Sequence, residues 1–273
     1  MVSLRRVCRA LDVNRSSVYL PVESSSKQAK ARLDEEIVGR LKALVQQHPT
    51  FGYRRLWALL RFGQNVLVNL KKVHRIVQLR RWQVKERSVT PRPRVQQKVS
   101  RTERSNERWA MDVTHVYCGK DGWGHLAAVI DCHDRQIVGF AFALRGRAKE
   151  AERALEAACL ARFGTLRPAG DTPILRSDNG LIFTSNRFRE ACKFYRLAQE
   201  FITPYTPEQN GLIERFFRSL KEECAWQHNF GGFDEARLKI REWIGWYNGE
   251  RPHQALGYLS PTAFRQRQQQ MLV

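Results

Sequence analysis

The chain has 273 residues, a length that suggests one main domain with one or two small accessory domains. Its hydrophobic content of 42% and aromatic content of 10% are enough for a buried core and exclude a wholly disordered chain. The formal net charge is +20, and the first 104 residues hold 24 Lys and Arg against 7 Asp and Glu. This uneven distribution favours nucleic acid as a partner over a generic effect on solubility.

Cysteine spacing and hydropathy argue against several further classes of protein. The six cysteines are scattered with no C-x-x-C pair, which argues against a zinc knuckle or a disulfide framework and fits a reducing cytosol. No apolar run reaches the roughly 18 residues of a membrane helix, and no signal-peptide core precedes the first charged residues. We therefore expect a soluble, intracellular protein with no membrane association.

The N-terminal part of the chain is helical and basic in pattern. Residues 4–19 fit a helix–turn–helix within a domain at 1–25, and they fit any short helical hairpin equally well. Apolar stripes over 26–84, with Asn69 as the expected cap of LKKVHRIV, predict a second helical DNA-binding domain. Residues 85–105 contain two prolines and many basic residues without periodicity, and predict an extended basic linker.

The pattern changes to alternating strands and helices after residue 106. Strands are predicted at RWAMDVTHVY, HLAAVID, QIVGFAF, ILRS and LAQEFI, and helices at KEAERALEAACLARF, SNRFREACKFY and FDEARLKIREWIGWYN. This order predicts an α/β catalytic domain over 106–250, with a mixed five-stranded sheet flanked by helices and preceded by small all-α units. Residues 251–273 are expected to form a polar C-terminal tail.

One further helix, within TPYTPEQNGLIERFFRSLKEE, has an unusual polar face. Thr206 as N-cap and Gln209 three residues later match a capping box, which places the helix start at 206. Glu214 lies among polar residues on one arc, away from the apolar arc. The simple interpretation is an ion pair with Arg218, but Gly211 in the same helix costs about 1 kcal/mol relative to Ala and often marks a close approach.

Two aspartates favour a functional role for Glu214 over a simple surface ion pair. Asp112 lies in a strand on the face opposite Met111 and Val113, where the ordinary alternative is a solvated sheet face. Asp178 follows ILRS at a strand end, where the ordinary alternative is an Asx turn. Carboxylates from a strand, a strand end and a helix can hold two divalent cations such as Mg²⁺, which suits phosphodiester chemistry.

The motifs that carry these residues resemble a known family. WAMDVT, SDNG and PEQNGLIE, with 35 residues between Asp178 and Glu214 and with Lys221 seven residues further on, resemble the DDE catalytic core of transposases and retroviral integrases. YNGERPHQALGYLSP resembles the segment that follows this core. HPTFGYRRL and VNLKKVHRIV resemble the helical domain that precedes it in bacterial insertion-sequence transposases encoded in two overlapping frames.

The resemblance implies a ribonuclease H-like core in which Asp112, Asp178 and Glu214 are catalytic and bind Mg²⁺, with Mn²⁺ as a substitute and two ions in the site. It implies DNA cleavage followed by joining of the freed 3′-hydroxyl to another phosphodiester. Its implied partners are the element's terminal inverted repeats and target DNA, further copies of this chain on that DNA, and the first-frame product, fused by frameshifting. It places the protein in the bacterial cytoplasm with the nucleoid. The DNA-contact candidates are Lys221, Arg218, Asn210, Arg215, Asn179, Arg15, Ser16, Tyr53, Arg54, Lys71, Lys72 and Arg75.

Two other functions fit parts of the pattern. A metal-dependent nuclease of the same fold would also use clustered carboxylates, but it would cleave without strand transfer. A DNA-binding regulator with an inactive core would bind DNA without needing the carboxylates. The helical DNA-binding domains and the basic linker favour the transposase over both.

Overall fold

The computed structural model describes residues 4–13, 34–84, 102–203 and 206–271, which form two compact units, Met1–Lys42 and Ala43–Val273. The first unit begins with helix α1 (Leu4–Ala10), so the first helix predicted within residues 4–19 is present. The second predicted helix, with Arg15 and Ser16, lies outside the described residues, as does most of the predicted linker at 85–105. None of the described helices is both long enough and apolar enough to cross a membrane.

In the described part of the helical region predicted over 26–84, residues 34–84 form α3 (Glu35–Gln47), α4 (Tyr53–Ala58), the π-helical turn Leu59–Gly63 and α5 (Leu70–Leu79). The Asn69 side chain accepts a hydrogen bond from the Lys71 backbone N–H and caps α5 as predicted. Helices α4 and α5 bury Leu56, Val73 and Ile76. The predicted apolar stripes are therefore the packing faces of these helices.

A single mixed sheet forms the centre of the second unit. Its strands are β1 (Arg108–Tyr117), β2 (Trp123–Asp131), β3 (Ile137–Ala143), β4 (Ile174–Ser177) and β5 (Ala198–Phe201). Their order is β3-β2-β1-β4-β5, with antiparallel pairing from β3 to β1 and parallel pairing from β1 to β5. The predicted mixed five-stranded sheet is confirmed.

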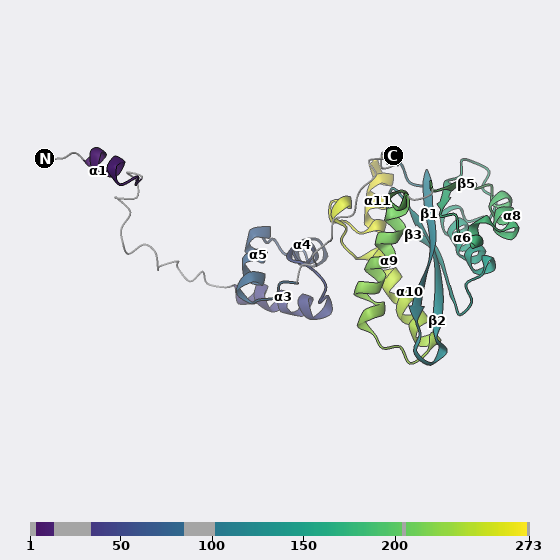
Figure 1. Cartoon of the computed structure of the whole chain (residues 1–273), viewed down its shortest axis with the longest axis horizontal. Helices are drawn as coiled ribbons and strands as arrows, with labels where there is room; N and C mark the ends of the chain where they lie inside the picture. Colours follow the sequence, from purple (N-terminus) through teal and green to yellow (C-terminus); the bar gives the residue numbers. More distant parts are fainter. Residues whose placement is uncertain (1–3, 14–33, 85–101, 204–205, 272–273) are drawn as a thin grey trace. The chain divides into compact units, whose positions relative to one another are not determined.

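Helices cover both faces of this sheet (Figure 1). They are α6 (Ala148–Phe163), α7 (Leu181–Thr184), α8 (Asn186–Phe194), α9 (Gly211–Glu223), α10 (Phe233–Gly249) and α11 (Pro261–Met271). On one face Trp109 and Met111 of β1 pack in a core with α6 and α8. On the other face Ala110 and Val116 pack in a core with α9 and α10. Because successive side chains of β1 point to opposite faces, this strand contributes residues to two separate cores.

The chain end differs from the predicted polar tail. Arg251 and His253 are buried, and residues 261–271 form helix α11. The Ser260 hydroxyl accepts a hydrogen bond from the Ala263 backbone N–H, and Pro261 takes the first helical position. A serine cap followed by proline is a strong helix start, so polar composition alone misled the prediction.

Candidate active site

Two of the predicted carboxylates lie at matching positions along neighbouring parallel strands, Asp112 within β1 and Asp178 directly after the end of β4. The β1–β4 ladder pairs Ala110 with Arg176, its last pair. Asp112 and Asp178 each stand two residues beyond this pair, and therefore on the same face of the sheet as Ala110. Helix α9 packs on that face, and Asp112 is half-buried there.

The third carboxylate comes from the helix over that face. Helix α9 begins at Gly211, and Glu214 is the acidic residue of its first turn. Ile213, Phe216 and Leu220 bury the opposite side of the helix against the sheet, which leaves Glu214 exposed. The amphipathic pattern thus fixes the rotation of α9 and with it the direction of Glu214.

The start of α9 differs from the predicted capping box. A 3₁₀ turn, Pro207–Asn210, precedes the α-helix. The Thr206 hydroxyl donates to the Thr203 carbonyl oxygen, and the Gln209 side chain accepts the Thr203 N–H at 2.9 Å. Both side chains therefore hydrogen-bond to Thr203, within the loop that precedes the 3₁₀ turn. As a result, Glu214 lies one turn from the helix start, where its charge interacts favourably with the helix dipole.

Electrostatics show that the three carboxylates influence one another. Burial raises the pKa of Asp112 to about 6, and repulsion from Asp178 and Glu214 adds to the rise. A hydrogen bond from the Val113 N–H and the positive charge of Lys221 act in the opposite direction. The site thus concentrates negative charge, with Lys221 as the cation at its edge.

The carboxylates do not form a ready-made metal cage. Among the described His, Cys, Asp and Glu residues, no group of three or more stands close enough to hold a metal ion. Asp112 Oδ1 accepts the Val113 N–H at 2.7 Å, and Asp178 Oδ1 accepts the Gly180 N–H at 2.9 Å. The Asx turn that was the ordinary alternative for Asp178 is therefore present beside the strand end. Like charges repel, which disfavours closer approach of these carboxylates to one another.

Arg176 is a positioning residue that the motif analysis missed. It is buried, its Nε lies 2.8 Å from Glu200 Oε2, and its Nη1 donates to the Gln209 carbonyl oxygen at 3.0 Å. It thereby ties the strand that carries Asp178 to the turn that leads to Glu214. An arginine inside the otherwise apolar strand ILRS was the available signal, because a buried arginine needs fixed partners.

The predicted DNA-contact residues separate into several places. Arg218 Nε lies 3.0 Å from Glu222 Oε1, so Arg218 is paired within its own helix. The Asn179 amide donates to the Ile202 carbonyl oxygen at 2.9 Å. Asn210 is 2% exposed, which corrects its assignment to DNA contact, since a buried side chain cannot reach a DNA strand. Arg215 is exposed on α9 on a different side from Glu214.

The remaining candidates lie on the helices before the core. Tyr53 and Arg54 are in α4, and the Arg54 Nε donates to the Tyr53 hydroxyl at 3.3 Å. Lys71 and Arg75 are exposed on α5, and Lys72 is half-buried there.

Comparisons with protein families define the class of protein. A model of an HTH-like domain matches residues 32–88, and two models of an integrase core domain match residues 102–207 and 195–261. The fold and the matched regions together are those of an integrase core preceded by an HTH-like domain.

Individual relatives place the chain more narrowly. It is 31% identical over 265 residues to an uncharacterized 39.2 kDa protein of insertion element IS476 from Xanthomonas euvesicatoria, covering 96% of this chain and 72% of the relative. It is 27% identical over 274 residues to transposase InsD of insertion element IS2 from Escherichia coli, covering 96% and 90%. The chain belongs to the family of insertion-element transposases with an integrase-like core.

Solved structures with a similar fold include retroviral integrases. The chain is 20% identical to the catalytic core domain of BIV integrase, with a TM-score of 0.44, covering 61% of this chain and 97% of that domain. It is 21% identical to a chain of a simian T-cell lymphotropic virus intasome complex, with a TM-score of 0.48, covering 78% and 70%.

Proposed function

We propose that the chain cleaves DNA at the ends of an insertion element and joins the freed 3′-hydroxyl to a phosphodiester of target DNA. Asp112, Asp178 and Glu214 are the catalytic carboxylates of this proposal. The observation that carries it is the matching position of Asp112 in β1 and Asp178 directly after the end of β4, together with the effect that the charges of Asp178 and Glu214 have on Asp112.

The donor set fits hard divalent cations. Three carboxylates offer only oxygen ligands, the type that Mg²⁺ and Mn²⁺ prefer. Burial, with repulsion from Asp178 and Glu214, raises the pKa of Asp112, and a bound cation would offset both effects. Two bound ions would supply Lewis-acid stabilisation of the attacking and leaving oxygens.

The side chains of the protein position the ions and the DNA in this proposal. The carboxylates fix the position of the ions relative to the sheet, and Lys221 attracts the phosphate of the strand to be cut. In cleavage, water attacks a phosphodiester and a 3′-hydroxyl leaves. In joining, that hydroxyl attacks a second phosphodiester, whose own 3′-oxygen departs with a proton. One phosphodiester replaces another, so no nucleotide cofactor is required.

The proposal includes partners and location. The ends of one element must be held together before joining, so we propose that several copies of this chain assemble on its terminal inverted repeats. We also propose that the first-frame product of the element contributes, as a frameshift fusion. An enzyme with these substrates works in the cytoplasm at the nucleoid.

A strand-transfer assay with matched variants tests this proposal. The substrates are labelled duplexes that carry the ends of the insertion element containing this reading frame, with a plasmid as target. Asp112→Asn, Asp178→Asn and Glu214→Gln should each abolish cleavage and joining while DNA binding survives. Asp171→Asn, at an exposed aspartate before β4, is the control and should retain both activities. Cleavage without joining in Mg²⁺ and Mn²⁺ would identify a plain nuclease instead.

A further inference from the structure

A second site lies on a different side of α9 from Glu214. A cavity of about 1180 Å³ opens there, and neither Glu214 nor Lys221 lines it. Its walls come from α4, α5, α9 and the segment 247–258. We call it the arginine pocket, after the five arginines in its lining: Arg54, Arg55, Arg135, Arg215 and Arg251.

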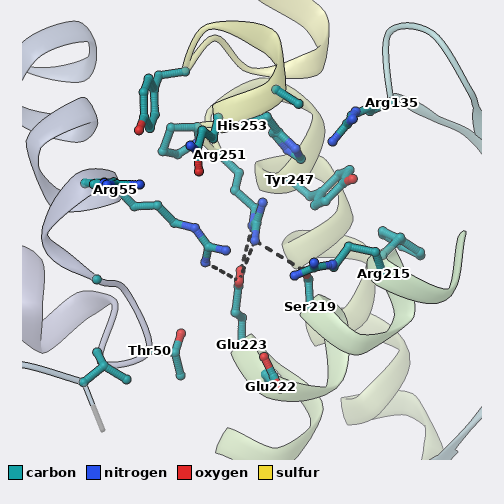
Figure 2. A pocket seen from close by; sticks show the side chains of 18 of the residues that line it. Thr50, Arg55, Arg135, Arg215, Ser219, Glu222, Glu223, Tyr247, Arg251 and His253 are labelled. Atoms are coloured by element: carbon teal, nitrogen blue, oxygen red, sulfur yellow. Dashed lines mark hydrogen bonds and ion pairs between the residues drawn. The ribbon is translucent and has the colours of Figure 1, made fainter. Parts of the chain in front are cut away.

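The carboxylates of the arginine pocket neutralise only part of this charge. Glu223 is held by two of the arginines: Arg55 Nη1 lies 3.0 Å from its Oε1, and Arg251 lies at 2.6 and 2.8 Å from its two oxygens. Figure 2 shows these groups meeting at the centre, with Ser219 beside them. The other carboxylate, Glu222, is 3.0 Å from Arg218, which does not line the pocket.

Two arginines therefore offer their charge to a ligand. Among the described residues, neither Arg135 nor Arg215 has a side-chain hydrogen bond or an ion pair with a carboxylate. Figure 2 shows them on either side of Tyr247, facing the same space. Burial lowers the pKa of Arg135, and the positive charge of the nearby Arg215 lowers it further, while Tyr247 acts in the opposite direction. An anion between them would relieve this repulsion.

A buried histidine shows how positive the arginine pocket is. His253 is 7% exposed, and its Nε2 has no hydrogen-bond partner among the described residues. Burial lowers the pKa of His253 to about 2, and the charges of Arg251, Arg135 and Arg55 contribute to the decrease. The imidazole is therefore neutral at physiological pH, and the surrounding guanidinium groups favour an anion over a cation.

The turn between β2 and β3 holds Arg135 in place. Asp134 accepts the Gln136 N–H at 2.9 Å and the Arg162 guanidinium at 2.8 Å. Asp131, also fully buried, accepts the Asp134 N–H at 3.2 Å. Arg135 itself has a φ of 61°, a left-handed conformation that costs a non-glycine residue about 1 kcal/mol. The network thus holds the backbone of this turn, which places Arg135 in the wall of the pocket.

The size and composition of the arginine pocket restrict the class of ligand that it can bind. Its volume exceeds the range of about 300–1,000 Å³ typical of small-molecule sites, so it is larger than one inorganic phosphate requires. Arginine forks match phosphate oxygens, and tyrosines such as Tyr53 and Tyr258 offer surfaces for sugars and bases. We infer that the arginine pocket binds the phosphate backbone of a DNA strand, as a contact separate from the carboxylate site. This inference rests on the proposed function, in which DNA is the substrate.

The test removes charge without exposing a buried carboxylate. Arg135→Gln, Arg215→Gln and the double variant are suitable, whereas Arg251 is not, because its loss would leave Glu223 without its closest partner. The control is Arg189→Gln, an exposed arginine on α8. Affinity for a labelled duplex is measured by fluorescence anisotropy in EDTA over a range of salt concentrations. Unfolding curves establish that each variant is folded, and Arg215, exposed on a helix, provides a variant that does not endanger folding.

We expect each single variant to weaken DNA binding about tenfold, which corresponds to one lost charge-assisted contact. The slope of log affinity against log salt should decrease by about 0.9 for each arginine removed. Arg189→Gln should change neither quantity. An unchanged affinity and slope in the double variant would overturn the inference.

A second arm separates DNA from free phosphates. Pyrophosphate is added at constant ionic strength, and its stabilising effect on thermal unfolding is compared between the wild type and the double variant. If pyrophosphate protection depends on the two arginines while DNA affinity does not, the pocket takes free phosphates and the DNA assignment is wrong. Because binding is measured in EDTA, failure of the strand-transfer chemistry would leave these results unaffected.

Discussion

Neutralising Asp112 should make the protein more stable. The pKa of this buried carboxyl is raised from 3.8 to about 6, by burial and by Asp178 and Glu214. A shift of about two units corresponds to about 3 kcal/mol at about 1.36 kcal/mol per unit. Asparagine removes the charge and its amide oxygen can still accept the Val113 N–H. We therefore expect Asp112→Asn to raise the free energy of unfolding by about 1–3 kcal/mol above pH 6.

The pH dependence gives the sign of the effect. Because the folded-state pKa lies above the unfolded one, the charged form of Asp112 destabilises the fold. This penalty is absent below the unfolded pKa of 3.8, grows as pH rises, and is complete above about 6. The advantage of Asp112→Asn should therefore appear between these values and stay constant above them. Asp171→Asn, at an exposed site, should show no such advantage.

Urea unfolding, monitored by tryptophan fluorescence, measures this difference at several pH values in EDTA and in Mg²⁺. Mg²⁺ should stabilise the wild type in proportion to its binding, and it should stabilise Asp112→Asn much less. A variant that is less stable than the wild type at neutral pH, or an advantage that persists at pH 4, would refute the reasoning.

Three other changes test the packing around the site. Glu223→Ala should lower the free energy of unfolding by about 3–5 kcal/mol, since it leaves Arg251 buried without its partner; a loss below 1 kcal/mol in urea unfolding would contradict this. Gly139→Ala should be destabilising by about 1–3 kcal/mol, because a Cβ there would overlap the backbone of α6, and an unchanged melting temperature would exclude that overlap. Gly211→Ala should be neutral or stabilising by up to about 1 kcal/mol, because nothing lies within 4 Å of the added carbon. Thermal unfolding of this variant and of Gly139→Ala, measured under the same conditions, compares the two effects.

Sequence periodicity predicted the five strands of the core and its longer helices, but not the short helix α7. The alternation along RWAMDVTHVY placed Asp112 opposite Met111 and Val113, and the two cores of the structure are built on that alternation. The amphipathic pattern of α9 likewise separated Glu214 from the apolar arc. What the pattern lacked was the register of β1 against β4, which depends on contacts distant in sequence and which places Asp112 level with Asp178.

Local rules were less reliable where side chains had other partners. Thr206 and Gln209 have the spacing of a capping box, but both bond to Thr203, so the α-helix begins at Gly211. The arginine pocket could not be predicted at all, because its lining comes from segments separated by more than a hundred residues. Only tertiary structure brings Arg55 and Arg251 to the same glutamate.

The most direct test of the central claim is strand transfer by the purified protein in Mg²⁺, with the wild type and Asp112→Asn compared on the same end-bearing duplex. We predict joined products for the wild type and none for the variant, while both bind the duplex with equal affinity. Equal joining by the two proteins would contradict the assignment of Asp112, and therefore the carboxylate site on β1, β4 and α9.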